Sequence, residues 1–251
     1  MGEKKSGRFS PSLMTLTAVL ITIFMIVGLF GNAITIVALL RCPRVRNATS
    51  PAVFICSLCI ADFSFCLLVL PFEISRFANG AWTLGEGFVC VLFPLLRYWN
   101  VGCSLLSIAM ITINRFVMIA FNDLYKKIYE RRWVVVQIAF IWLYSFGMLT
   151  PTLAGSWGRF GYHPLLMTCT IVRVNGHSAK IALFWIGFLI PCIAIIICYI
   201  GIFLVISGMK ETSQQKKSRE ERARKNEMRI TRMSLVIFLT FLVCYLPAIV
   251  F

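Results

Sequence analysis

The sequence predicts an all-α membrane protein in which several helices cross the bilayer. Of its 251 residues, 59% are hydrophobic and 14% are charged, and the mean hydropathy is +0.83. Apolar runs long enough to cross the ~30 Å hydrocarbon layer, which takes ~20 helical residues, recur along the chain. We expect one transmembrane domain, residues 1–251, with spans at about 12–40, 51–78, 88–121, 132–151, 180–208 and 229–251.

Positive charge predicts the orientation of these spans. Thirteen Lys and Arg residues lie in the segments 41–50, 121–131 and 209–228, whereas five lie in the N-terminal tail and the loops on the other side. Because Lys and Arg accumulate on the cytoplasmic side, we expect the N-terminus to be extracellular. This distribution argues against nucleic acid as the reason for the net charge of +15. Part of the basic stretch 216–232 is expected to meet anionic membrane lipid.

Two of the ten cysteines stand apart from the others. Eight lie within spans or at their cytoplasmic edge, where a cysteine acts as a small apolar residue. Cys90 and Cys169 lie in regions that the topology places outside the cell, where oxidising conditions allow a disulfide. We expect a bridge between them that pins the outer loop 152–179, which is long enough for a hairpin, to the top of the third span.

The third span, 88–121, is apolar on most of its surface but carries Arg97, Asn100, Ser104 and Arg115. The 18 residues from Arg97 to Arg115 make five helical turns, so the two arginines share a face, and the other two residues lie near it. Because polar groups that face lipid are costly, we expect this polar seam to face other helices. The alternative is that the arginines only snorkel to the two membrane interfaces.

A carboxylate lies in the middle of the second span. Asp62 is expensive there unless it has a partner, and Asn100 and Ser104 supply neutral oxygens from adjacent turns of the third span. Because a hard cation accepts oxygen ligands, we expect a polar site that can hold a sodium ion as an allosteric ligand. The alternative is a protonated Asp62 hydrogen-bonded to Asn32. We expect no other cofactor and no structural metal.

Arg97 is the candidate anchor for a ligand. It lies seven residues after Cys90, roughly 10 Å beneath the outer end of its helix at ~1.5 Å per residue. A charge at that depth costs about 2.5–3.5 kcal/mol, so it needs a partner. Its planar guanidinium suits a carboxylate or a phosphate, which predicts an anionic ligand. The alternative partner is Glu73, eleven residues beyond Asp62, and both readings hold if the ligand displaces Glu73.

Eight sequence elements together resemble a rhodopsin-like G-protein-coupled receptor. They are Gly31-Asn32, Leu58 with Asp62, Trp82 with Gly85, Cys90, Arg115, Trp142, Pro191 with Tyr199, and Phe241 with Pro247. The resemblance covers helices one to six and implies a seven-transmembrane receptor bundle of which six helices are present. It also implies a multi-pass plasma-membrane protein that is not an enzyme. Since six spans would leave the C-terminus outside, we expect a sequence truncated before the seventh helix.

Two loops resemble a narrower group of receptors. Residues 155–161, GSWGRFG, and 122–129, NDLYKKIY, look like the arthropod receptors called moody and trapped in endoderm, and more distantly like melatonin receptors. The resemblance implies an extracellular ligand, a heterotrimeric G protein on the cytoplasmic face, and a role in cell migration, polarity or glial barrier control.

The family resemblance also implies roles for individual residues. It adds Asn100 and Tyr245 to the ligand site, since Tyr245 lies where the family usually has its toggle Trp. It also adds Asn32 to the sodium pocket. Its aminergic members carry an aspartate where this chain has Arg97, which speaks against an amine ligand. The expected G-protein switch consists of Asn114, Arg115, Phe116, Tyr199 and Glu227. The residues expected to repack in the core are Leu105, Pro191, Phe241, Tyr245 and Pro247.

The switch departs from the family pattern. Asn114 replaces the usual acid and Phe116 the usual Tyr, so we expect Glu227, at the base of the sixth helix, to be the resting partner of Arg115. The alternative function is a six-span transporter or channel, but the sequence shows no inverted repeat of broken helices and no pore signature. A membrane enzyme is a third possibility. Against it, the sequence shows no His-rich or paired-acid cluster, because His163 and His177 lie alone in an outer loop.

Overall fold

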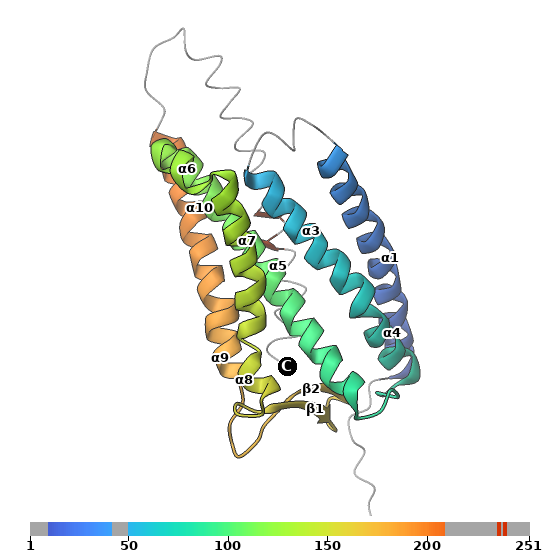
Figure 1. Cartoon of the computed structure of the whole chain (residues 1–251). Coiled ribbons are helices and arrows are strands. Elements are labelled where there is room, and N and C mark those ends of the chain that lie inside the picture. The colour runs from blue at the N-terminus through green and yellow to red at the C-terminus, as the bar shows by residue number, and fades with distance from the viewer. Residues whose placement is uncertain (1–9, 42–49, 209–234, 237, 240–251) are drawn as a thin grey trace, which may run out of the picture.

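The computed structural model describes residues 10–41, 50–208, 235–236 and 238–239. Figure 1 shows long helices lying side by side, with a two-stranded hairpin across one end of the bundle. In this part of the chain five helical segments are long and apolar enough to cross a membrane: Pro11–Arg41, Pro51–Asn79, Phe88–Ala120, Arg131–Leu153 and Lys180–Ser207. They match the first five predicted spans to within two residues at each end.

The elements follow one another with short connections. In chain order they are α1 (Pro11–Arg41), α3 (Ser50–Leu68), α4 (Leu70–Asn79), α5 (Phe88–Ala120), α6 (Asn122–Ile128), α7 (Arg131–Gly147), α8 (Thr150–Leu153), β1 (Arg159–His163), β2 (Thr168–Val172), α9 (Lys180–Ala182), the π-helix η1 (Leu183–Leu189) and α10 (Ile190–Gly208). The two strands pair antiparallel, so the hairpin expected in the outer loop is present.

Prolines interrupt three of the predicted helices. The second span is not one helix: α3 ends at Leu68 and α4 begins at Leu70, because Pro71 has no amide hydrogen to donate to the preceding turn. Pro191 has the same effect in the fifth span, where η1 provides the wider π-turn before α10. The fourth span divides into α7 and α8, and Pro151 lies in the first turn of α8.

The sixth predicted span, 229–251, lies mostly outside the described residues. Residues 235, 236, 238 and 239 are helical, and Phe238 is buried in the main hydrophobic core. Glu227, Phe241, Tyr245 and Pro247 lie outside the described residues, so the roles expected of them stay predictions.

Helix α5 is the centre of the bundle, because it packs against α3, α7 and α10 and runs between them in Figure 1. It contributes Leu105 and Ile108 to the main core, where they meet Phe54 of α3 and Ile195 of α10. Leu105 is almost completely buried, and Pro191 is buried at the start of α10. Helix α1, in contrast, exposes most of its large apolar side chains, as expected of a helix that faces lipid.

Candidate functional site

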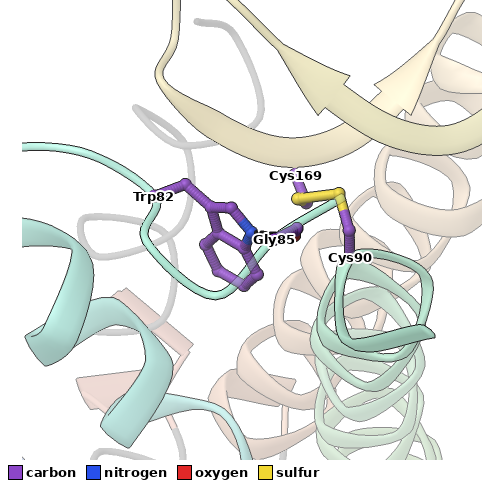
Figure 2. Close-up of a disulfide and its surroundings, with 4 residues drawn as sticks. All are labelled: Trp82, Gly85, Cys90 and Cys169. Atoms are coloured by element: carbon purple, nitrogen blue, oxygen red, sulfur yellow. Dashed lines mark hydrogen bonds between the residues drawn. A yellow bond between two sulfur atoms is a disulfide. The ribbon is translucent and has the colours of Figure 1, made fainter. Parts of the chain in front are cut away.

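The N-terminal end of α5 is covered by the β1–β2 hairpin, which a disulfide attaches to it. Cys90, in the first turn of α5, is bonded to Cys169 of β2, and their Cα atoms are 5.2 Å apart. Both cysteines are fully buried, in one apolar cluster with Trp82. Figure 2 shows the Trp82 indole beside Gly85, beneath the hairpin, and the indole Nε1–H donates to the Gly85 carbonyl at 2.6 Å. The predicted disulfide is confirmed.

Two polar contacts add to this attachment. Tyr98 of α5 and Thr170 of β2 share a hydrogen bond of 3.1 Å between their hydroxyl groups. Arg76 of α4 donates from Nη2 to the carbonyl oxygen of Leu166, in the hairpin turn, at 2.9 Å. The hairpin is therefore fixed to both α4 and α5, in addition to its disulfide.

Below the hairpin, one carboxylate lies between two arginines. Arg97 Nη1 contacts Glu73 Oε1 at 3.0 Å, and Arg76 Nη1 contacts Glu73 Oε2 at 3.1 Å. The side chain of Glu73 is 11% exposed, against 18% for Arg76 and 24% for Arg97. The structure therefore contains the ion pair that was the alternative partner for Arg97.

The sequence analysis did not identify Arg76 as part of this site. Helix α4 places Glu73 in its first turn and Arg76 in its last, and a spacing of three residues brings two side chains together on one helix face. That spacing was the available signal. Because each guanidinium carries a full positive charge, the three side chains together carry one excess positive charge.

The mid-membrane polar site forms between α3 and α5. Ser104 Oγ donates to Asp62 Oδ1 at 2.7 Å. Asn100 is buried, and its Nδ2 donates to the Leu96 carbonyl, while its Oδ1 has no hydrogen-bond partner in the described part of the chain. Asn32 donates from Nδ2 to the Gly28 carbonyl at 2.9 Å. Among the described residues no hydrogen bond joins Asn32 to Asp62, so the alternative pairing is not observed.

The side chains of Asp62, Ser104 and Asn100 offer oxygen atoms of the kinds that a hard monovalent cation accepts. These are a carboxylate, a hydroxyl and an amide oxygen that has no hydrogen-bond partner among the described residues. No cluster of three or more His, Cys, Asp or Glu side chains that could hold a metal ion occurs in the described part of the chain. By ligand type, these three side chains are compatible with a sodium ion.

The C-terminal end of α5 carries the predicted switch residues. Asn114 is fully buried, and neither its Nδ2 nor its Oδ1 has a hydrogen-bond partner among the described residues. The ring of Phe116 lies against Gly201 of α10, where an added Cβ would be 2.5 Å from the ring atom Cε2. Tyr199, also on α10, packs at the edge of the main core. The predicted tether of Arg115 involves Glu227, which lies outside the described residues.

The segment after α5 is ordered as α6, where the sequence analysis expects only a loop. The rings of Tyr125 and Tyr129 lie 5.0 Å apart, and Tyr129 meets Phe54 of α3 edge to face. Burial raises the pKa of Tyr129 to about 12. This packing fixes the segment beside the switch residues.

Comparison with known proteins decides the family. Residues 31–251 match the family model described as "7 transmembrane receptor (rhodopsin family)". The chain belongs to the rhodopsin family of seven-transmembrane receptors. It shares the fold of squid rhodopsin, with a TM-score of 0.81 and 25% identity over 97% of this chain and 72% of that one. This membership makes it a multi-pass membrane protein and gives no support to the transporter or channel alternative.

Among relatives, this rhodopsin-family chain is similar to the G-protein coupled receptor moody of Drosophila melanogaster, at 44% identity over 95% of the chain and 44% of that protein. It is 36% identical to Protein trapped in endoderm-1 of the same organism, over 90% of the chain and 62% of that protein. Melatonin receptors are more distant. The resemblance to these three groups is confirmed. The chain spans less than two thirds of the length of the first two relatives.

Proposed function

We propose that the chain is the ligand-binding and signal-transmitting part of a plasma-membrane receptor that activates a heterotrimeric G protein. Family membership and the similarity to a protein named as a G-protein coupled receptor support this proposal. The observation that carries it is the arrangement of α5. This single helix has a charged cluster under a fixed outer hairpin at one end and the Asn-Arg-Phe sequence at the other.

The two ends of α5 are far apart but mechanically connected. Arg97 and Arg115 are 18 residues apart, or about 27 Å along the axis at 1.5 Å per residue. The helix between them is buried against three neighbours. A ligand that binds the two end states of the bundle with different affinity shifts their populations. A change at Arg97 can therefore alter the packing of Phe116 on α10.

The ligand that we propose carries an anionic group and binds at Arg97, with Glu73, Asn100 and Tyr245 as further parts of the site. Support comes from the partial exposure of Arg97 and from the excess positive charge of its cluster. The guanidinium offers a carboxylate or a phosphate two parallel hydrogen bonds. Entry from the extracellular side follows from the proposed orientation of the N-terminus.

At the inner end, we assign the switch to Arg115, with Glu227 as its resting partner. Breaking the pair frees the sixth helix to move, and Tyr199 then hydrogen-bonds in the opened cavity. Asn114 supports this assignment, because it brings no charge next to Arg115 that could serve instead. The polar site at Asp62, Asn100 and Ser104 would hold a sodium ion that favours the resting arrangement.

The test of G-protein coupling is a transfected-cell assay of the full-length receptor. Basal dissociation of each class of Gα from Gβγ is measured by energy transfer, in cells with matched surface expression. We expect one class to respond, and Arg115→Ala to abolish the response. Arg132→Ala is the control, since Arg132 is exposed and pairs with Glu130. No basal response above untransfected cells in any class, or an unchanged response in Arg115→Ala, would contradict the proposal.

A second comparison tests the anionic ligand. Arg97→Gln and Glu73→Gln are measured side by side against candidate extracts, with surface expression as the control. Loss of the response in Arg97→Gln alone supports the anchor. Wild-type potency in Arg97→Gln would contradict the proposal that Arg97 anchors an anionic ligand.

A further inference from the structure

Glu73 receives a different arginine on each of its two carboxylate oxygens. Oε1 faces Arg97 of α5 and Oε2 faces Arg76 of α4, at 3.0 and 3.1 Å. The two guanidiniums thus come from separate helices and converge on one planar group with two oxygens. Such an arrangement selects for a carboxylate, because each oxygen has its own donor at hydrogen-bond distance.

The charge of the cluster is unbalanced. Two positively charged guanidiniums face one carboxylate, and the side chains of the three residues are at most 24% exposed. Charges that are partly removed from water interact more strongly than exposed ones. The two arginines therefore favour an anion between them, and removal of Glu73 should cost more stability than removal of one partner of a fully exposed ion pair.

We propose that Arg76 and Arg97 form a carboxylate-binding site in which the Glu73 side chain is the resident occupant, and that the receptor's ligand takes the place of Glu73 with its own carboxylate. The ligand part of this inference rests on the proposed function; the site itself does not. Arg76 is a ligand-binding residue in this scheme, equal in role to Arg97.

The site is also connected to the outer hairpin. The same guanidinium of Arg76 that binds Glu73 through Nη1 donates from Nη2 to the carbonyl of Leu166 in the hairpin turn. A ligand carboxylate that replaces Glu73 keeps this contact only if it holds Arg76 in place. Occupation of the site is thereby linked to the position of the hairpin above it.

The test is chemical rescue by a small carboxylate. Glu73→Ala removes the CH2–COO⁻ portion of the side chain, and acetate has the size and charge to replace it. The melting temperature of the purified full-length receptor is measured with acetate, with acetamide as the neutral equivalent, and with chloride at equal ionic strength. Because Glu73→Ala leaves two partly buried arginines unpaired, we expect a drop of at least about 4 °C relative to wild type.

Acetate at about 100 mM is expected to restore about 3–5 °C if it binds with a Kd near 10 mM, whereas acetamide and chloride restore nothing. The wild-type receptor should not respond to acetate, because Glu73 occupies the site. Glu86→Ala is the matched control, since Glu86 is exposed in the turn before α5. Acetate rescue should disappear when Arg76→Gln or Arg97→Gln is added to Glu73→Ala.

If Glu73→Ala gives too little protein, Glu73→Ser is used, because it also removes the carboxylate and leaves room for acetate, while its hydroxyl can accept one hydrogen bond. A smaller shift specific to acetate is then expected. Equal effects of acetate and acetamide in the variant that is measured would overturn the inference, as would a rescue that survives Arg76→Gln. The readout contains no G protein, so a receptor that signals without rescue contradicts only this inference. Rescue in a receptor that activates no G protein contradicts only the proposed function.

Discussion

Replacing Gly201 by alanine should strain the inner end of the bundle. A Cβ at this position of α10 would lie 2.5 Å from Cε2 of Phe116 and 3.1 Å from both Cδ2 and Cζ. Carbon atoms in optimal contact are about 3.5–4.0 Å apart, so the ring edge or α10 must move by roughly 1 Å. The strain expected from this substitution therefore falls on Phe116, the residue that follows Arg115.

Two opposing effects set the magnitude. Added methyl groups in a packed interior typically cost about 1–3 kcal/mol, whereas Gly→Ala within a helix gains up to about 1 kcal/mol. Gly31→Ala in α1 is the matched control, because a Cβ there would meet no atom of the described residues within 4 Å. The difference between the two variants cancels the helix-propensity gain. It should equal the strain alone, about 2–12 °C in melting temperature at about 2–4 °C per kcal/mol.

The assay is thermal unfolding of the purified full-length receptor, followed by tryptophan fluorescence. Phe116→Leu should recover most of the loss in Gly201→Ala, because neighbouring residues that share a contact do not act additively. Basal G-protein activation should change in Gly201→Ala and not in Gly31→Ala. Equal melting temperatures for the two alanine variants would refute the reasoning and show that α10 does not depend on glycine at this contact.

Three further predictions concern other contacts. Cys90→Ala or Cys169→Ala should lower surface expression, because the disulfide contributes about 2–4 kcal/mol, and mass spectrometry should find the pair oxidised in the wild type. Sodium chloride should raise the melting temperature relative to choline chloride, and Asp62→Asn should remove that difference, since the carboxylate is the charged ligand of the proposed ion. Glu227→Ala should raise basal signalling and Asn114→Asp should lower it, as measured by Gα–Gβγ dissociation.

Each of these predictions has a control and a contrary result. Cys103→Ala also changes a buried cysteine, but one without a disulfide, and an equal loss of surface expression would argue against the bridge as the cause. A sodium effect that persists in Asp62→Asn would exclude the carboxylate as ligand. Unchanged basal signalling in Glu227→Ala would exclude the tether, and Arg132→Ala serves as the unrelated charge change.

The spans and the disulfide could be predicted because each follows from one dominant physical constraint. A chain that crosses hydrocarbon has to form continuous apolar helices, so the predicted and observed spans agree to within two residues at each end. The disulfide followed from compartment, since Cys90 and Cys169 were the pair on the oxidising side. The contact between Asp62 and Ser104 followed from the cost of an unpaired carboxylate in the membrane.

The helix interruptions and the charge pairs were harder to predict from the sequence. Pro71 and Pro191 each lack a backbone amide hydrogen, which interrupts the helical hydrogen bonds. The interruption can be a helix break, as between α3 and α4, or a π-turn, as in η1, and packing selects which of the two forms. Helix α6 is too short to be stable alone, so it depends on the contact of Tyr129 with Phe54. Arg76 lies near a span boundary, where an arginine can equally well snorkel to the interface.

Asn114 is the departure from the family pattern that lies next to Arg115. Its amide is fully buried, and neither of its polar atoms has a hydrogen-bond partner among the described residues. An unsatisfied buried polar group of this kind costs about 1–3 kcal/mol, so an arrangement that gives the amide a partner is favoured. A charged acid at this position could hold Arg115 by an ion pair, whereas a neutral amide cannot. We therefore place the proposed charged partner of Arg115 on another helix, at Glu227.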